Sequence, residues 1–173
     1  RMEKLVSQFR GEEAVVTAIK KTPKKTPAPL LYDLTELQRD ANKKYGFSAK
    51  ETLNIMQRLY ENHKVLTYPR TDSRYLSSDI IPTLKDRLAA CQTGPYRKMA
   101  LMASKQTLPG KPAFVNDAKV SDHHAIIPTE QSAQLSHMTN EEWKIYDLVV
   151  RRFMAVFFPP FQYEQTQVTV EIA

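Results

Sequence analysis

The residues best suited to chemistry lie in "KVLTYPRTDSRYL", residues 64 to 76. Tyr68 precedes a proline, which keeps its backbone out of the helical region and lets its side chain project from an extended turn. Arg70 lies two residues further on, so in an extended segment it points to the same side. A cation beside a tyrosyl hydroxyl favours the phenolate and can hold a phosphate oxygen. The pair therefore predicts nucleophilic attack on a phosphate, with a tyrosine that covers a strand end as the structural alternative.

The rest of this motif supplies further hydrogen-bonding groups. Thr71, Ser73 and Arg74 carry donors, and Asp72 carries an acceptor. Together with Arg70 they are more typical of a phosphate pocket than of a core. The alternative is a solvated loop in which Asp72 forms a surface ion pair with an arginine, which would stabilise little.

A second motif, "SDHHAIIPT", contains His123 and His124. Adjacent histidines diverge in most backbones, and the chain has no HxxxH, CxxC or acidic cluster at ligand spacing, so a zinc site is not predicted. A histidine that binds phosphate or moves a proton is the functional interpretation, and a surface histidine is the alternative. The chain has only 4 glycines and no glycine-rich phosphate loop, so ATP hydrolysis is not expected.

Composition narrows the class of protein. Among 173 residues, 25 Lys and Arg exceed 19 Asp and Glu, a net charge of +6 that mildly favours a polyanionic partner. Cys91 is the single cysteine, which fits a reducing cytoplasm. The sequence contains no apolar run of about 18 residues and no signal peptide at its start. We expect a soluble cytoplasmic protein with no membrane partner. The start without methionine, and the alternation that continues to the end, predict a segment of a longer chain.

The spacing of apolar residues and turn signals predicts the elements. Residues 12–20 read as a strand, and "KKTPKKTPAP" as a basic linker. Capping signals at Asp33 and Ser48 begin two helices that end near Gly46 and residue 62. With the short strand "KVLTY" these helices predict a helix-turn-helix and a wing-like element.

Further elements complete the prediction. Helices are expected over residues 77–91 and 139–157, loops around at most one short helix over 93–122, and a strand at the end. The fold class is α+β, mainly α, with a helical domain between strands of a neighbouring β domain. We place the domains at residues 1–28 (strand and basic linker), 29–135 (helical and tyrosine-bearing) and 136–173 (helix and strand returning to the β domain).

Three segments together resemble a known family: "LTYPRTDSRYL", "SDHHAIIPT" and "PLLYDLTELQRDANKKYGFSAKETLNIMQRLYE". They resemble a bacterial type IA DNA topoisomerase of the topoisomerase III kind, from about Phe9 to the final strand. The resemblance implies a catabolite-activator-like helical domain flanked by strands of an arch-forming β domain. It also implies transient cleavage of single-stranded DNA through a 5′-phosphotyrosyl link, strand passage and religation, without ATP, for relaxation or decatenation.

The resemblance also implies roles for single residues. Tyr68 takes the place of the nucleophile, Arg70 that of the arginine on the scissile phosphate, and His123 that of the histidine that supports cleavage. The residues implied in DNA binding are Thr71, Asp72, Ser73, Arg74 and His124. Mg²⁺ is bound in the family by an N-terminal toprim domain, which has no counterpart in this sequence. Its expected partners are single-stranded DNA and the remaining domains of the same polypeptide, on the nucleoid, and alone it is expected to be inactive.

Two other functions remain open at this point. One is a winged-helix module with a structural tyrosine, which would present Lys50, Asn54, Gln57 and Arg58 to duplex DNA. The other is a lysine-rich domain for an acidic protein partner. Covalent attachment to DNA separates both from the enzyme.

Overall fold

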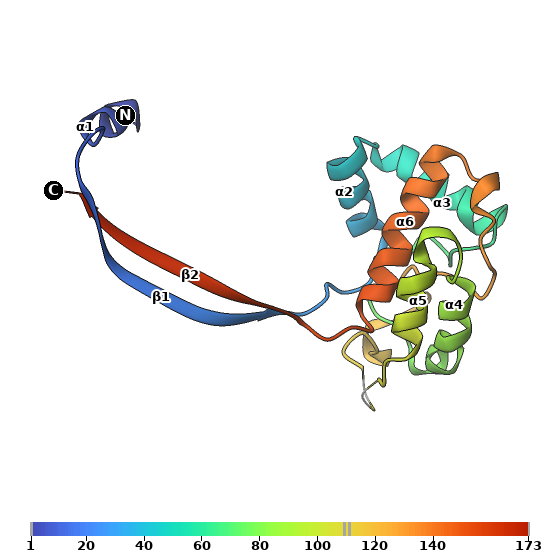
Figure 1. The fold of residues 1–173 in the computed structure, drawn as a ribbon. Helices are drawn as coiled ribbons and strands as arrows, with labels where there is room; N and C mark the ends of the chain where they lie inside the picture. The colour runs from blue at the N-terminus through green and yellow to red at the C-terminus, as the bar shows by residue number, and fades with distance from the viewer. Residues whose placement is uncertain (1, 109, 111, 173) are drawn as a thin grey trace. The chain divides into compact units, whose positions relative to one another are not determined.

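The chain folds into two compact units, seen in a computed structural model that describes residues 2–108, 110 and 112–172 (Figure 1). One unit, here the ladder unit, consists of Arg1–Pro27 and Pro160–Ala173. The other, the helical unit, is Ala28–Pro159. The mixture of helices and a strand pair agrees with the predicted α+β class.

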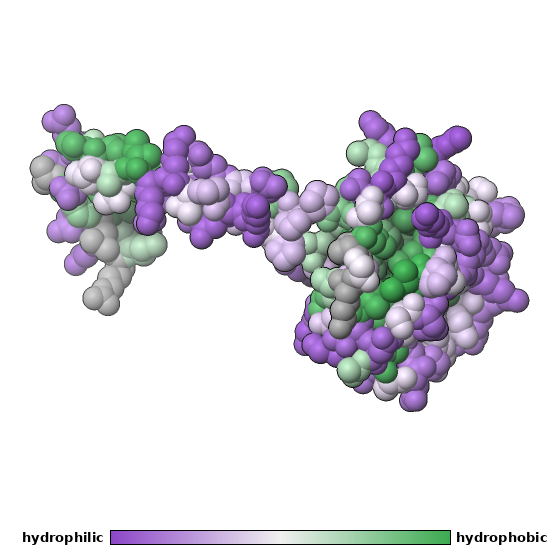
Figure 2. All heavy atoms as spheres, turned by 90° about the horizontal axis from the view of Figure 1, so that it is seen from below, coloured by the Kyte–Doolittle hydropathy of each residue, from purple (hydrophilic) through white to green (hydrophobic). Residues whose placement is uncertain are grey.

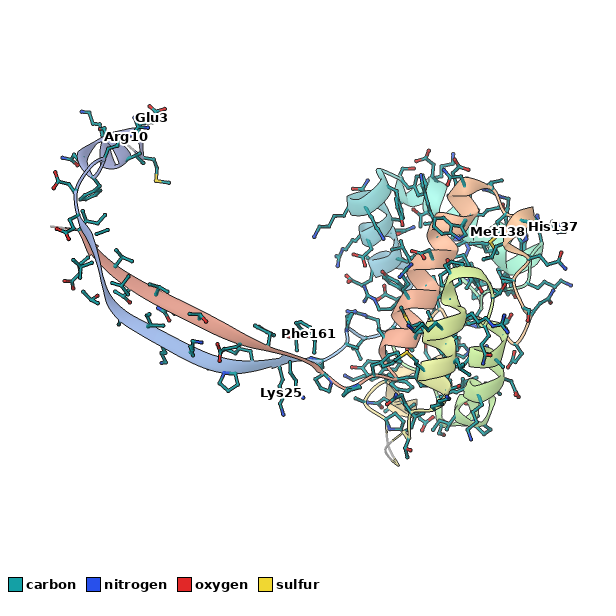
Figure 3. All side chains as sticks on the ribbon, in the orientation of Figure 1. Glu3, Arg10, Lys25, His137, Met138 and Phe161 are labelled. Carbon is teal, nitrogen blue, oxygen red and sulfur yellow. The ribbon has the colours of Figure 1, made fainter. Side chains whose placement is uncertain are left out.

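The ladder unit contains a short helix and two long strands. Helix α1 is Met2–Gln8, and strands β1 (Ala14–Thr26) and β2 (Phe161–Ile172) pair antiparallel. The register runs from Ala14 opposite Ile172 to Thr26 opposite Phe161, with an irregularity between Val16 and Ala18. Lys25 and Phe161 are labelled at this second end in Figure 3.

The predicted basic linker is wrong over most of its length, because β1 continues through the lysines and prolines to Thr26. Pro23 pairs with Glu164 in this ladder. A proline cannot donate a ladder hydrogen bond, but an edge strand leaves alternate N–H groups facing away from its partner, and both strands here are edges. The lysines are exposed along the ladder, and Lys21 forms an ion pair with Glu164 at 3.0 Å.

The described residues of the helical unit form three α-helices that begin after predicted N-caps and two that begin without a side-chain capping bond. They are α2 (Leu34–Tyr45), α3 (Ala49–Glu61), α4 (Leu84–Ala90), α5 (Arg97–Ser104) and α6 (Asn140–Ala155). Ser48 with Glu51, and Thr139 with Glu142, form complete capping boxes, as predicted. Gly46 ends α2 in the left-handed region, at a φ of 75°.

The predicted helix over residues 77–91 divides in two. Its first part is the 3₁₀ helix η1 (Ser78–Thr83), and only its second part is α4. Pro82 lies inside η1, where its missing N–H and rigid ring disfavour a regular α-helix.

Helix α6 lies in the core of the helical unit, so it does not return to the β domain as predicted for residues 136–173. Ile145, Val150, Phe153 and Met154 are fully buried along it. It packs against α2, α3 and α5. The apolar face of α6 is therefore covered by its own unit, and only β2 pairs with β1.

Helices α2 and α3 pack together after the tight turn, but the predicted wing strand is absent over residues 64–68. Leu66 forms only an isolated bridge, with Pro128.

Figure 2 shows hydrophilic side chains over much of the helical unit around an apolar area on the visible face. None of the helices in the described part of the chain is long and apolar enough to cross a bilayer.

Candidate active site around Tyr68

Two segments that are far apart in sequence lie side by side around Tyr68. The N–H of Thr67 donates to the carbonyl of Ile127 at 3.0 Å, and that of Thr129 to Val65 at 3.0 Å. This pairing brings the tyrosine motif alongside the histidine motif.

Threonine hydroxyls fix the register between the two motifs on both sides of Tyr68. The Thr67 hydroxyl accepts from the N–H of Ile127 at 3.0 Å and donates to the carbonyl of Ala125 at 3.4 Å. The Thr71 hydroxyl donates to the carbonyl of His123 at 2.9 Å. Because these bonds reach the main chain next to the histidines, they determine which residue faces Tyr68.

That residue is His123. The Tyr68 and His123 rings have centroids 4.3 Å apart and are tilted by 38°. The ring of Tyr60, near the end of α3, packs edge-to-face against the Tyr68 ring, with the two ring centroids 5.5 Å apart. Tyr68 is half-buried and His123 is exposed, so solvent or a ligand can reach the pair. An imidazole so close to a phenol can accept its proton or hold a phosphate oxygen beside it.

Two open hollows meet at Tyr68, and Thr67, Tyr68 and His123 line both. The first, here called the aspartate hollow, has a volume of about 310 Å³. The second, the Tyr60 hollow, has a volume of about 720 Å³. The aspartate hollow is also lined by Ser77, Asp79, Asp117, Val120, Ser121, Asp122 and His124, and the Tyr60 hollow by Tyr60, Glu61, Lys64, Leu66 and Thr129.

Exposure alternates along the residues that follow Tyr68. Arg70 and Asp72 are exposed, whereas Thr71 and Ser73 are buried. The side chain of Arg70 makes no hydrogen bond or ion pair to any residue that the structure describes, so its guanidinium is available to a ligand. This period of two is that of an extended segment, which agrees with the predicted placement of Tyr68 and Arg70 on one side.

Thr71 and Ser73 are not placed to bind a ligand through their hydroxyls. The Ser73 hydroxyl donates to the carbonyl of Lys119 at 2.7 Å and accepts from the N–H of Tyr75 at 3.1 Å. The Thr71 hydroxyl also accepts from the N–H of Ser73 at 3.1 Å. Both side chains therefore hold the loop in shape. Arg74 is half-buried, and its Nε donates to the carbonyl of Leu31 at 3.2 Å.

His124 is half-buried, and the ring contact with Tyr68 is made by His123. The Nδ1 of His124 donates to its neighbour's carbonyl, that of Ala125, at 2.7 Å. Burial lowers the pKa of His124, the bond to Ala125 raises it, and the charge of Arg87 lowers it. The net shift is downward, which favours the neutral ring.

Comparison with known proteins identifies the family. A family model described as DNA topoisomerase matches residues 1–173. The chain belongs to the DNA topoisomerase family. It is 57% identical to "DNA topoisomerase 3" of Bacillus subtilis over 169 residues, 98% of this chain and 23% of that protein. It is also 57% identical to "DNA topoisomerase 3" of Bacillus cereus over 172 residues, 99% of this chain and 24% of that protein.

A solved structure agrees with this assignment. Full-length topoisomerase I from Thermotoga maritima matches with a TM-score of 0.65 and 26% identity, over 98% of this chain and 27% of that one. The resemblance to a type IA topoisomerase of the topoisomerase III kind is confirmed. This topoisomerase chain spans about a quarter of the length of the relatives it matches.

The sequence motifs of this topoisomerase chain did not reveal Arg87, a buried side chain on α4 that supports the histidine motif. Its guanidinium donates to the carbonyl of Pro128 at 2.8 Å and to the Thr83 hydroxyl at 2.8 Å, and pairs with Glu130 at 2.9 Å. Thr67 was also missed. Its position directly before Tyr68 could have indicated a supporting role. Adjacent side chains of an extended segment point to opposite sides, so Thr67 does not share the side of Tyr68.

The donor set does not fit a resident metal ion in this part of the topoisomerase. Within residues 2–108, 110 and 112–172, no group of three or more His, Cys, Asp or Glu side chains could hold one.

Proposed function

We propose that this chain carries the nucleophile of a type IA DNA topoisomerase, and that Tyr68 attacks a phosphodiester of single-stranded DNA. The observation that carries the proposal is the contact between the Tyr68 and His123 rings at 4.3 Å, open to solvent between two hollows. It joins a potential nucleophile and a proton acceptor from two different motifs.

The reaction is a transesterification. The Tyr68 hydroxyl oxygen bonds to phosphorus as its proton leaves, and the bond from phosphorus to the 3′ oxygen breaks. The released oxygen takes up a proton and becomes the 3′-hydroxyl, while the 5′-phosphate stays on Tyr68. Attack by that hydroxyl reverses the step after a second strand has passed. The number of phosphoester bonds is conserved, so ATP is not required.

The remaining residues either contact the DNA phosphate or support the loop that carries Tyr68. His123 accepts the phenolic proton or binds the phosphate, and Arg70 binds the scissile phosphate with a guanidinium that has no partner among the residues the structure describes. Asp72 and Arg74 flank this contact. Thr71 and Ser73 act by holding the loop, and His124 lines the aspartate hollow beside it.

The complete polypeptide supplies what this chain does not. We propose that a further domain binds Mg²⁺, whose positive charge would stabilise the phosphate during transfer, and that the ladder unit is part of a β arch. The helical unit would then be the catabolite-activator-like domain. The separate 173-residue chain would bind DNA weakly and would not relax it, whereas the whole protein would relax or decatenate DNA in the bacterial cytoplasm.

The test uses the complete gene product, magnesium and a single-stranded oligonucleotide labelled at its 3′ end. Denaturing electrophoresis should show the label on protein, and peptide mapping should find it on the peptide with Tyr68. Tyr68→Phe should abolish this species, and Tyr75→Phe, which removes one hydroxyl from the same motif, should retain it. Arg70→Ala should slow cleavage on the order of 10²-fold. A labelled protein with Tyr68→Phe would disprove the assignment.

The winged-helix alternative is weaker for a structural reason. Of the side chains on α3 that would read a duplex, Arg58 donates to Glu142 at 2.7 Å, and Gln57 donates to Glu61. Both are occupied by contacts within the protein. Tight binding to duplex DNA without any covalent species would restore this alternative.

A further inference from the structure

The larger of the two hollows at Tyr68 is lined by Tyr60 and Lys64 in addition to Tyr68 itself. We propose that the Tyr60 hollow binds one nucleotide next to the phosphate attacked by Tyr68, with its base on the Tyr60 ring and its backbone phosphate on Lys64. The inference rests on the proposed function, because it takes the strand at Tyr68 as the ligand.

The position of Tyr60 carries the first step. The centroid of its ring lies 5.5 Å from that of the Tyr68 ring, yet 36% of Tyr60 remains exposed. Any nucleotide bonded through its phosphate to Tyr68 therefore lies within reach of a second aromatic ring. Bases stack on exposed aromatic side chains with little regard to sequence, because every base has a π face.

Lys64 supplies the charge. Among the described residues it is the non-glycine residue with positive φ, at 56°, a conformation that lysine rarely adopts. The surrounding bonds hold it there: the Thr129 hydroxyl donates to the carbonyl of Lys64 at 2.7 Å, and the N–H of Val65 donates to Leu59 at 3.0 Å. Strain of this kind is often found where a side chain must point at a ligand.

Charge decides between the two hollows. The aspartate hollow contains Asp79, Asp117 and Asp122, which repel a phosphate backbone. Besides His123, which lines both hollows, the Tyr60 hollow contains one acid, Glu61, whose carboxylate accepts a hydrogen bond from Gln57, and one lysine, Lys64. The polyanionic strand is therefore better accommodated on the side of Tyr60.

The test measures binding without chemistry, in the complete gene product carrying Tyr68→Phe. Fluorescence anisotropy with a single-stranded oligonucleotide should show about tenfold weaker binding after Tyr60→Leu, and near-normal binding after Tyr60→Phe, which keeps the ring. Because Tyr60→Leu could also disturb the ring at position 68, each measurement is repeated on oligonucleotides with one abasic site. The abasic site is moved along the strand.

Stacking predicts that the effect of Tyr60→Leu disappears when the abasic site occupies one of the two positions flanking the scissile phosphate. A packing defect would persist at every position and would overturn the inference, as would no loss of binding at all. Lys64→Met should reduce the slope of log affinity against log salt by about 0.7, and the matched Lys85→Met on α4 should not.

The two proposals fail separately. If wild-type protein forms the covalent species but the Tyr60 and Lys64 variants bind normally, only this inference is wrong. If wild-type protein forms no covalent species, the proposed function itself is wrong.

Discussion

The hydroxyl of Thr71 donates a hydrogen bond to the main-chain carbonyl of His123 at 2.9 Å. Through this bond the loop that carries Tyr68 is attached to the residue whose ring faces it. Thr71 is itself buried, so the bond is protected from water. The position of Tyr68 relative to His123 therefore depends on polar contacts behind the two side chains.

Removing that hydroxyl should loosen the site. In Thr71→Val the carbonyl of His123 and the N–H of Ser73 both lose a hydrogen-bond partner. The free energy of unfolding of the 173-residue chain, measured in urea, should therefore fall by about 1–3 kcal/mol. Cleavage by the complete gene product should slow as well. Thr71→Ser keeps the hydroxyl and serves as the control. Equal behaviour of the two variants would show that the hydroxyl is dispensable.

Arg87 should contribute, after burial, to the lowered pKa of His124, and it should also hold the segment that carries this histidine. In Arg87→Met a positive charge near His124 is lost, so the pKa of His124 should rise, as measured by an NMR titration of its ring protons. The carbonyl of Pro128 also loses its donor, at a cost of about 1–3 kcal/mol. Lys85→Met, on the exposed side of the same helix, should change neither quantity. An unchanged titration would contradict the electrostatic coupling.

Glu142 should make stability depend on acid pH. Burial raises the pKa of this carboxyl, but hydrogen bonds from Arg58, Thr139 and His63 outweigh it and hold the pKa below the ordinary value of 4.5. A depressed folded pKa means that the free energy of unfolding contributed by Glu142 is present above pH 4.5 and falls as the pH drops through the folded pKa.

The measurement is urea unfolding of Glu142→Gln and of the exposed neighbour Glu141→Gln at several pH values. The Glu142→Gln variant should lose stability at neutral pH and show a flatter acid dependence, because its amide cannot titrate. Glu141→Gln should follow the wild type. An acid profile of Glu142→Gln parallel to the wild type would show that another group is responsible.

Cys91 should be inert in the folded chain. Burial raises the pKa of its thiol to about 12, although a hydrogen bond with Tyr146 lowers it. At pH 8 the thiolate is therefore scarce, and alkylation by iodoacetamide should be at least about a thousandfold slower than for a free thiol of pKa about 8.5. Labelling in increasing urea should follow global unfolding. Rapid labelling of the native chain would show that the core around Tyr146 opens locally.

Local signals in the sequence predicted local structure well. The N-caps at Asp33, Ser48 and Thr139 lie where the residue types placed them, because each bond closes within three residues. The strand over residues 21–26 could not be predicted in this way. Its partner lies beyond the whole helical unit, and nothing local distinguishes a lysine-proline strand from a linker.

The candidate site shows the same division between local and distant information. The motif predicted that Tyr68 and Arg70 share a side, and the exposed pattern agrees. The hydroxyl groups of Thr71 and Ser73 and the family resemblance also predicted these two residues as DNA contacts. The alternation of an extended segment places these two on the opposite side, and their carbonyl partners come from distant segments.

The ladder unit has a consequence for the order of folding. Thr26 pairs with Phe161, so no rung of the ladder can form until the two ends of the helical unit have met. Closing a long flexible loop costs entropy, whereas a folded helical unit brings its own ends to fixed places. We expect the helices to collapse first and the strands to zip afterwards, starting at Thr26 and Phe161. The ladder unit would then be the last part of the chain to form and the first to be lost.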